Sequence, residues 1–118
     1  MDVVQDDSFE EVEVEEGVHL AQLAAGEEMS IQHLRIEPGG RVPEHSHHHE
    51  QVGFVYQGEQ TFELDGGEVV TVGPGGSYRL ESDEIHAAEN RGEEELLAID
   101  VFSPPRADPN WLESVTHD

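Results

Sequence analysis

Short apolar segments separated by glycine-rich turns run along most of this chain and limit the folds open to it. In EVEVEEGV, near the amino terminus, valine alternates with charge at period two, which is typical of a strand with one face in water. Further strands are expected at HLAQL, MSIQHLRIEP, QVGFVYQGE, QTFELDG, EVVTVGP, SYRLES and ELLAIDVFS, with turns such as PGGR, DGGE and GPGG between them. No segment carries a sustained helical period. The chain is therefore predicted to be all-β, an antiparallel sandwich or small barrel.

The length of 118 residues suits one domain with a core of its own. Residues 1–11 are expected to be an acidic flexible tail and residues 12–103 the β-barrel. The segment PPRADPNW, which follows Ser103, is too rich in proline to be a central strand. Residues 104–118 are therefore predicted to form an extended arm that lies on the barrel, with Trp111 as its anchor.

The charge balance is extreme, because 28 acidic residues face five arginines and no lysine, for a formal net charge of −23. Such a surface repels phosphates and anionic lipids, so we expect no nucleic-acid partner and no membrane partner. High charge with low hydrophobicity is also typical of disorder, but the regular strands and turns argue against disorder for most of the chain. The composition instead indicates a folded domain for a high-salt cytoplasm, where salt screens the self-repulsion.

Three further features narrow the class of protein. The absence of cysteine excludes disulfides, thiolate ligands and cysteine nucleophiles. No apolar run is long enough for a membrane helix, and the acidic amino terminus lacks a signal-peptide pattern. A soluble cytoplasmic protein is expected.

The densest chemical signal is the stretch EHSHHHEQ, with four histidines in five positions. A solvated loop edge is the simplest interpretation. However, residues two apart in a strand face the same side, so His45 and His47 can place their imidazoles together. If one unbroken strand runs through the stretch, Gln51 joins them, whereas His48 and Glu50 point away. Two imidazoles and an oxygen donor suit a first-row transition metal.

A fourth ligand is expected from His86, which follows a strand-like stretch and a turn. Which residue of this stretch supplies the third ligand stays open at this point. His49 has the parity of His47 and replaces Gln51 if the strand bulges, and Glu50 is a further alternative. The other histidines have no partner at ligand spacing and are predicted to lie at the surface: His19, His33 and His117.

One carboxylate out of 28 stands apart from the rest. Asp100 lies in the apolar segment LLAIDVFS and shares its parity with Ala98 and Phe102. A surface pair with Arg106 is the simplest interpretation. Yet a charge inside a small barrel is costly unless it is paired or linked to a metal, so Asp100 is a candidate functional residue.

Two motifs in this chain resemble those of the cupin family. Gly39, His45, His47, Gln51 and Gly58 follow the spacing of the first cupin motif, with glutamine where glutamate is frequent. The run Pro74-Gly75-Gly76, followed by His86 and Asn90, resembles the second motif with a longer gap before the histidine. The resemblance implies a small antiparallel β-barrel of the jelly-roll type (a double-stranded β-helix), commonly a homodimer. It also implies one divalent transition metal per chain. Histidine and glutamine ligands can bind Zn, Ni, Fe, Mn or Co.

Within that family, HSHHHEQVGFVYQGE, PGGSY and DVFSPPR are similar to the KdgF-like pectin-degradation proteins. The resemblance implies an enzyme that converts 4,5-unsaturated monouronates, or a related sugar acid, to the linear keto form. The resemblance also implies a small anionic substrate, with Asp100 as the catalytic carboxylate and Arg106 in contact with the carboxylate of the substrate. The implied metal ligands are His45, His47, Gln51 and His86, and the implied pocket residues are Phe102, Tyr78 and Phe54.

Two other functions fit the same residues. Three histidines and a glutamine can leave neighbouring metal positions open, as an Fe-dependent cupin oxygenase requires. A module that binds a metal or a sugar without catalysis is also compatible, since the fold alone does not define a reaction.

Overall fold

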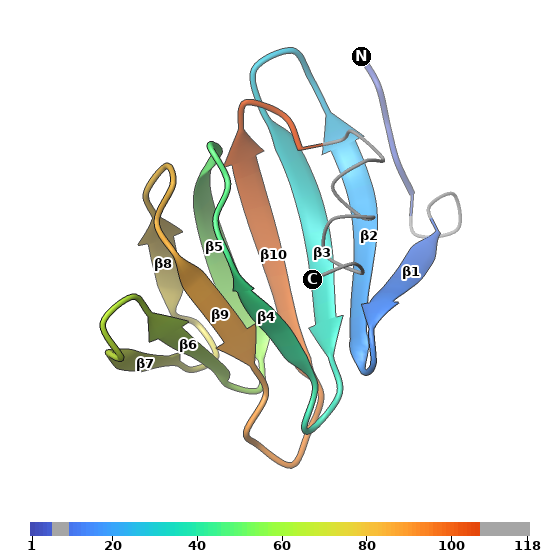
Figure 1. Cartoon of the computed structure of the whole chain (residues 1–118). Helices are drawn as coiled ribbons and strands as arrows, with labels where there is room; N and C mark the ends of the chain where they lie inside the picture. The colour runs from blue at the N-terminus through green and yellow to red at the C-terminus, as the bar shows by residue number, and fades with distance from the viewer. Residues whose placement is uncertain (6–9, 107–118) are drawn as a thin grey trace.

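The computed structural model describes residues 1–5 and 10–106, which form two antiparallel β-sheets (Figure 1). The larger sheet has the order β1-β2-β3-β10-β5-β8, and the smaller sheet has the order β4-β9-β6-β7. The larger sheet contains β1 (Glu11–Glu15), β2 (Val18–Ala25), β3 (Ser30–Ile36), β10 (Leu96–Ser103), β5 (Glu50–Gln57) and β8 (Ser77–Leu80). The smaller sheet contains β4 (Arg41–His45), β9 (His86–Glu89), β6 (Gln60–Leu64) and β7 (Val69–Val72). The all-β, jelly-roll prediction is confirmed.

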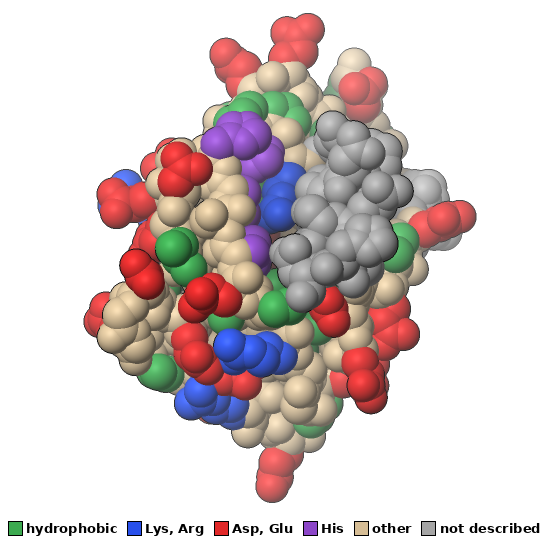
Figure 2. Space-filling model, viewed as in Figure 1, with side chains coloured by type: hydrophobic (Ala, Val, Ile, Leu, Met, Phe, Trp, Pro, Cys, Tyr) green, Lys and Arg blue, Asp and Glu red, His purple; other side chains and the backbone are tan. Residues whose placement is uncertain are grey.

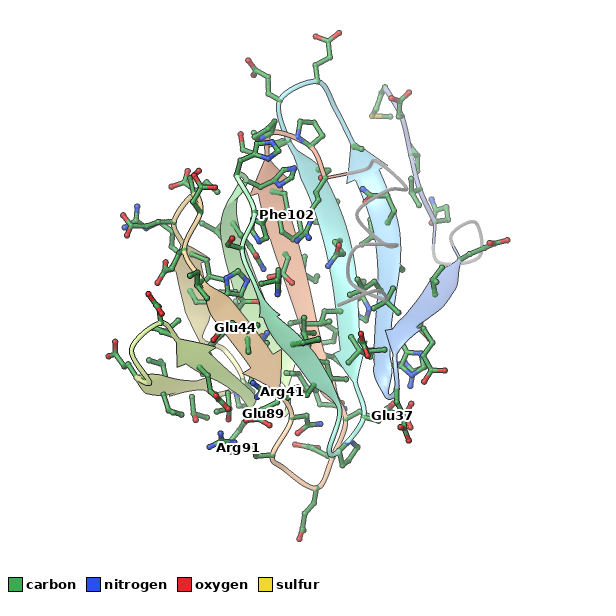
Figure 3. The ribbon with its side chains drawn as sticks, in the orientation of Figure 1. Glu37, Arg41, Glu44, Glu89, Arg91 and Phe102 are labelled. Carbon is green, nitrogen blue, oxygen red and sulfur yellow. The ribbon has the colours of Figure 1, made fainter. Side chains whose placement is uncertain are left out.

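The inward face of the larger sheet is apolar at one end of its strands and polar at the other. Toward one end, β3 and β10 bury Ile36, Leu34, Leu96 and Ala98, which pack with other apolar side chains into the main core. Toward the other end, the same two strands bury Gln32 and Asp100 in the same alternation. Burying apolar side chains stabilises the first end, whereas the second end holds polar groups that need partners. The functional site is therefore expected at the polar end, near Phe102 in Figure 3.

Two strands were not predicted from the sequence, and both belong to the smaller sheet. β4 contains Pro43, and β9 is short with two alanines, so neither has the β-branched composition that marks a strand. They pair antiparallel with each other, with His45 opposite His86. The single strand considered for His45 to Gln51 is also absent. The chain ends β4 in one sheet at His45, crosses through residues 46–49, and begins β5 in the other sheet.

Some predictions concern residues outside those described. Trp111, His117 and most of the predicted arm belong to this group, and so does part of the predicted acidic tail. Of the arm, residues 104–106 are described, and Arg106 at their end is buried. Across residues 1–5 and 10–106, no helix is long and apolar enough to span a membrane.

Four of the five arginines lie near the surface and pair with glutamates. Arg41 and Arg91, for example, both contact Glu63 and Glu89, and Figure 3 shows Arg41, Glu89 and Arg91 close together at one end of the molecule. Each surface ion pair contributes little to stability, and the 28 acidic residues far outnumber the five arginines, so most carboxylates have no arginine to pair with. The acidic side chains are spread over the visible face in Figure 2, so their mutual repulsion is distributed over the surface.

Raising KCl from about 0.1 M to about 1 M is expected to stabilise the fold, because the Debye length falls from about 10 Å to about 3 Å. Screening of a net charge of −23 should raise the melting temperature by about 5–10 °C, which corresponds to about 1–2 kcal/mol for a domain of this size. Differential scanning calorimetry at the two concentrations measures the change. An unchanged melting temperature would show that this surface is not adapted to salt.

Candidate functional site

Three histidines from separate segments meet at the polar end of the sandwich. His45 ends β4, His86 begins β9, and His47 lies in the crossing between the two sheets. The ring centroids of His45 and His86 are 4.4 Å apart, and those of His47 and His86 are 5.3 Å apart. One ring nitrogen of each histidine lies within 4.8 Å of the other two. Figure 2 shows histidine side chains gathered on this face beside a basic side chain.

The backbone sets the tautomer of all three rings. The Nδ1 atoms of His45, His47 and His86 lie 2.9, 3.0 and 2.9 Å from the carbonyl oxygens of Pro43, His49 and Glu84. A carbonyl can only accept, so each Nδ1 carries the proton and each Nε2 presents a lone pair. Metal-binding histidines are commonly oriented by a backbone carbonyl in this way.

His47 gives the clearest indication that the cluster suits a cation. Burial lowers the pKa of His47 to about 3, with further contributions from Arg106 and the neighbouring histidines, so the ring is neutral. Its Nε2 atom is buried and has no hydrogen-bond partner among the described residues. A buried lone pair is costly unless it meets a donor or a metal. This set of imidazole donors, with His47 held neutral, therefore fits a divalent transition metal.

The alternation of β5 distinguishes the possible oxygen ligands. Gln51 faces inward and is buried, whereas Glu50 is exposed and lies near Arg79. The side chain of Gln51 donates a hydrogen bond to Asp100, which leaves its amide oxygen as the atom available to a metal. His48 is exposed, and His49 lies outside the group of nitrogens within 4.8 Å. Gln51 is thus the oxygen donor best placed beside the three histidines.

Asp100 lies in a row of residues that crosses the larger sheet at one level. It is 1% exposed, and its register partners are Gln32 on β3 and Gly53 on β5. Gly53 in turn pairs with Tyr78 on β8, whose hydroxyl donates a hydrogen bond to Asp100 Oδ1. Tyr78 reaches Asp100 across the space above Gly53, which is open because glycine has no side chain. A Cβ at that position would overlap both Asp100 Oδ1 and the Tyr78 hydroxyl. The glycine therefore makes the tyrosine–aspartate contact possible.

Arg106 brings a positive charge to the same cavity. It is 7% exposed, its backbone N–H donates to Ser30 Oγ at 2.8 Å, and its guanidinium lies 5.2 Å from the centre of the Phe102 ring. Burial lowers the pKa of Arg106 to about 10, and the charge of Asp100 opposes that change. The side chain is therefore a cation at neutral pH. The surface pair considered from the sequence is wrong, because both Asp100 and Arg106 are buried.

Burial also raises the pKa of Asp100, while hydrogen bonds from Tyr78 and Gln51 and the charge of Arg106 oppose the increase. One cavity is lined by His45, His86, Gln51, Asp100, Arg106 and Phe102. Most of the predicted site residues therefore surround a single space. Tyr78 does not itself line this cavity, and it contacts the site through its hydrogen bond to Asp100.

Phe54 does not line the cavity that contains Asp100 and Arg106. Its side chain is 46% exposed and lies on the outer face of β5 with Val52 and Tyr56, so its prediction as a pocket residue is wrong. The reason is parity, since Phe54 lies three residues from the inward-facing Gln51. His19 and His33 also lie away from the site, with Nε2 atoms 2.6 Å from Glu37 Oε2 and 2.5 Å from the Tyr56 hydroxyl.

Sequence reasoning missed three residues of this region: Gly53, Gln32 and Gln60. Gln32 and Gln60 line the cavity, and Gly53 lies beneath the Tyr78 hydroxyl. Gln32 carried a usable signal, because it is a polar residue at the inward parity of β3, as Asp100 is on β10. Gly53 and Gln60 carried none, since their roles depend on strands that are distant in the sequence.

The family model for the cupin domain matches residues 32–102 of this chain. The chain is a cupin. Among solved structures, KdgF from a Halomonas species superposes with a TM-score of 0.81 at 28% identity, covering 92% of this chain and 97% of that one. An RmlC-like cupin from Shewanella frigidimarina superposes with a TM-score of 0.79 at 24% identity, covering 90% of this chain and 93% of that one, and shows the fold alone.

A curated relative of the cupin is the "H2HPP isomerase" of Bacillus subtilis, which is 35% identical over 69 residues. The match covers 58% of this chain and 28% of that protein, so the cupin corresponds to less than a third of its relative. The resemblance to KdgF-like cupins drawn from the three sequence stretches is confirmed by the fold and its coverage.

In this cupin, Gly53→Ala is expected to lower the free energy of unfolding by about 1–3 kcal/mol, because the new Cβ overlaps Asp100 and Tyr78. The melting temperature should fall by about 5–15 °C. Gly73→Ala is the matched control, since a Cβ there meets nothing within 4 Å. Equal melting temperatures for the two variants would contradict the close packing above Gly53.

Proposed function

We propose that this cupin isomerises an unsaturated sugar acid, converting a 4,5-unsaturated monouronate to its linear keto form. The observation that carries the proposal is that Asp100 and Arg106 are buried in one cavity with His45 and His86, two of the three converging histidines. A buried carboxylate, a buried guanidinium and a metal-binding donor set are more than a structural core needs. Together they suit proton transfer on an anionic substrate.

Arg106 is the proposed site for the substrate carboxylate. Its planar fork can donate two parallel hydrogen bonds to a carboxylate, and its position within the cavity protects that pairing from water. It also offsets the field of a protein with a net charge of −23, which otherwise repels an anionic substrate. The cavity is thus locally favourable to an anion on an acidic protein.

Asp100 is the proposed proton carrier. The isomerisation removes a proton from the anomeric hydroxyl, breaks the bond between the anomeric carbon and the ring oxygen, and passes the electron pair to that oxygen as an enolate. A proton then arrives on the alkene carbon, and the enolate becomes a ketone. A single carboxylate can accept the first proton and deliver the second, which conserves all atoms. Tyr78 holds that carboxylate in place through its hydroxyl.

His45, His47, His86 and Gln51 are the proposed metal ligands, and their donor set fits Zn, Ni, Fe, Mn or Co. Such an ion would supply a Lewis acid that stabilises negative charge on a substrate oxygen. Because Gln51 is neutral, this set leaves the site more positive than a carboxylate ligand would.

The similarity to KdgF and to a protein named as an isomerase supports an isomerase rather than the alternatives. An Fe-dependent oxygenase would consume oxygen when reconstituted with Fe(II), and a simple binding module would not need Asp100. The proposed isomerase requires neither oxygen nor any co-reactant.

The proposal is tested by adding metal-loaded protein, in high salt, to unsaturated monouronate freshly released by a polysaccharide lyase. The conjugated alkene absorbance should disappear faster than in buffer, and a chelator should abolish the difference. Decay at the buffer rate with each of the five metals would refute the proposed function.

The homodimer, the cytoplasmic location, the high-salt origin and the domain boundaries at residues 12 and 103 stay predictions. Size-exclusion chromatography with light scattering in high salt would measure the oligomeric state directly.

A further inference from the structure

Two buried glutamines lie in the wall of the cavity from opposite sheets. Gln32 on β3 is 5% exposed and Gln60 at the start of β6 is 1% exposed, and both line the cavity with Asp100 and Arg106. Within residues 1–5 and 10–106, neither amide oxygen has a hydrogen-bond partner. Buried amide oxygens are normally paired, so these two need an explanation.

The orientation of Gln60 follows from its neighbours. The Tyr78 hydroxyl donates its only proton to Asp100, so it can only accept from Gln60. The amide nitrogen of Gln60 therefore faces Tyr78, and the oxygen is the atom left over. This chain of contacts, from Gln60 through Tyr78 to Asp100, joins the smaller sheet to the larger one beside the cavity.

Gln32 is placed by the register of the larger sheet. It is the partner of Asp100 on the neighbouring strand and faces inward with it. An ordinary core would hold an apolar residue at this position, as it does two and four residues further along β3, at Leu34 and Ile36. The inward side chains of β3 are therefore polar at Ser30 and Gln32, up to the level of Asp100, and apolar beyond it.

We infer that Gln32 and Gln60 bind hydroxyl groups of the substrate and select a polyhydroxylated carboxylate over its deoxy analogues. This inference rests on the proposed function, in which Arg106 holds a carboxylate in the same cavity. An amide oxygen accepts a hydrogen bond from a hydroxyl and carries no charge, so it adds selectivity without repelling an anion. A ligand that lacks the matching hydroxyl leaves the buried acceptor unpaired and binds more weakly.

Ordered water is the competing explanation, because a buried water can satisfy an amide oxygen. The two explanations differ in a measurable way. A glutamine that binds a substrate hydroxyl affects only ligands with that hydroxyl. A glutamine satisfied by water affects all ligands to a similar degree, or none.

The test measures binding by isothermal titration calorimetry, with metal-loaded protein and saturated hexuronates that cannot react. The ligands are the parent hexuronate and its 2-deoxy and 3-deoxy analogues, and the variants are Gln32→Met and Gln60→Met, which nearly preserve volume. Each variant should weaken binding of the parent about tenfold, and should have little effect on the one analogue that lacks its hydroxyl. The control is Gln57→Met, because the Gln57 amide nitrogen donates a hydrogen bond to the backbone oxygen of Glu95 at 3.1 Å and the residue does not line the cavity.

Equal weakening of all three ligands, no weakening, or no binding of any hexuronate to the wild type would overturn the inference. Because Gln60→Met also removes the contact with Tyr78, Tyr78→Phe is measured beside it, and should leave the preference between parent and analogues unchanged. The ligands are not converted, so this result is independent of the alkene assay. Binding with the expected selectivity but without alkene loss would leave the inference standing and refute the proposed reaction alone.

Discussion

The Asp100→Asn variant is expected to convert unsaturated monouronate at least about 100-fold more slowly than the wild type at saturating substrate. Asparagine nearly preserves the shape of the side chain and can still accept the Tyr78 hydrogen bond, but it cannot accept and return a proton. The loss should appear in kcat, with a smaller change in KM. The measurement is the initial rate of alkene absorbance loss.

The matched control for this prediction is Asp65→Asn, which removes the same charge from an exposed turn residue. Metal content and melting temperature are recorded for both variants, because the charge of Asp100 also stabilises the buried Arg106 cation, and its loss can affect the fold. A folded, metal-loaded Asp100→Asn protein with wild-type kcat would remove Asp100 from the proposed mechanism.

Replacing a histidine of the cluster is expected to have a comparably large effect on metal binding. His86 is 3% exposed at the start of β9, with its Nδ1 on a backbone carbonyl, so His86→Ala removes one of three converging nitrogens. After dialysis, elemental analysis should find about one metal ion per chain in the wild type and almost none in the variant. Chelation should lower the melting temperature of the wild type and leave that of the variant unchanged, because only the wild type gains stability from binding.

His48→Ala provides the control within the same histidine run, since His48 is exposed and lies outside the group of converging nitrogens. It should retain wild-type metal content and the wild-type response to chelator. Equal metal loss in the His48 and His86 variants would indicate non-specific binding by the histidine run instead of a defined centre.

The region around the site illustrates what could be predicted and what could not. Asp100 was recognised because a charge in an apolar alternation is costly wherever that strand lies. Phe54 was placed wrongly although its parity against Gln51 was available in the sequence. The strands β4 and β9 were missed because Pro43 and two alanines give them little strand propensity. They are held in the sheet because β4 pairs with β9 and β9 also pairs with β6.

The sequence by itself determined the all-β class, the chemistry of the donor set, and the inward parity of Asp100 and Phe102. These properties follow from local alternation and side-chain type, which do not depend on distant residues. Only the tertiary structure decided that His45 meets His86, that Tyr78 reaches Asp100 over Gly53, and that Gln32 and Gln60 share their cavity. Those contacts depend on strand register and on the crossing between sheets at residues 46–49, where pairing joins segments far apart in the chain.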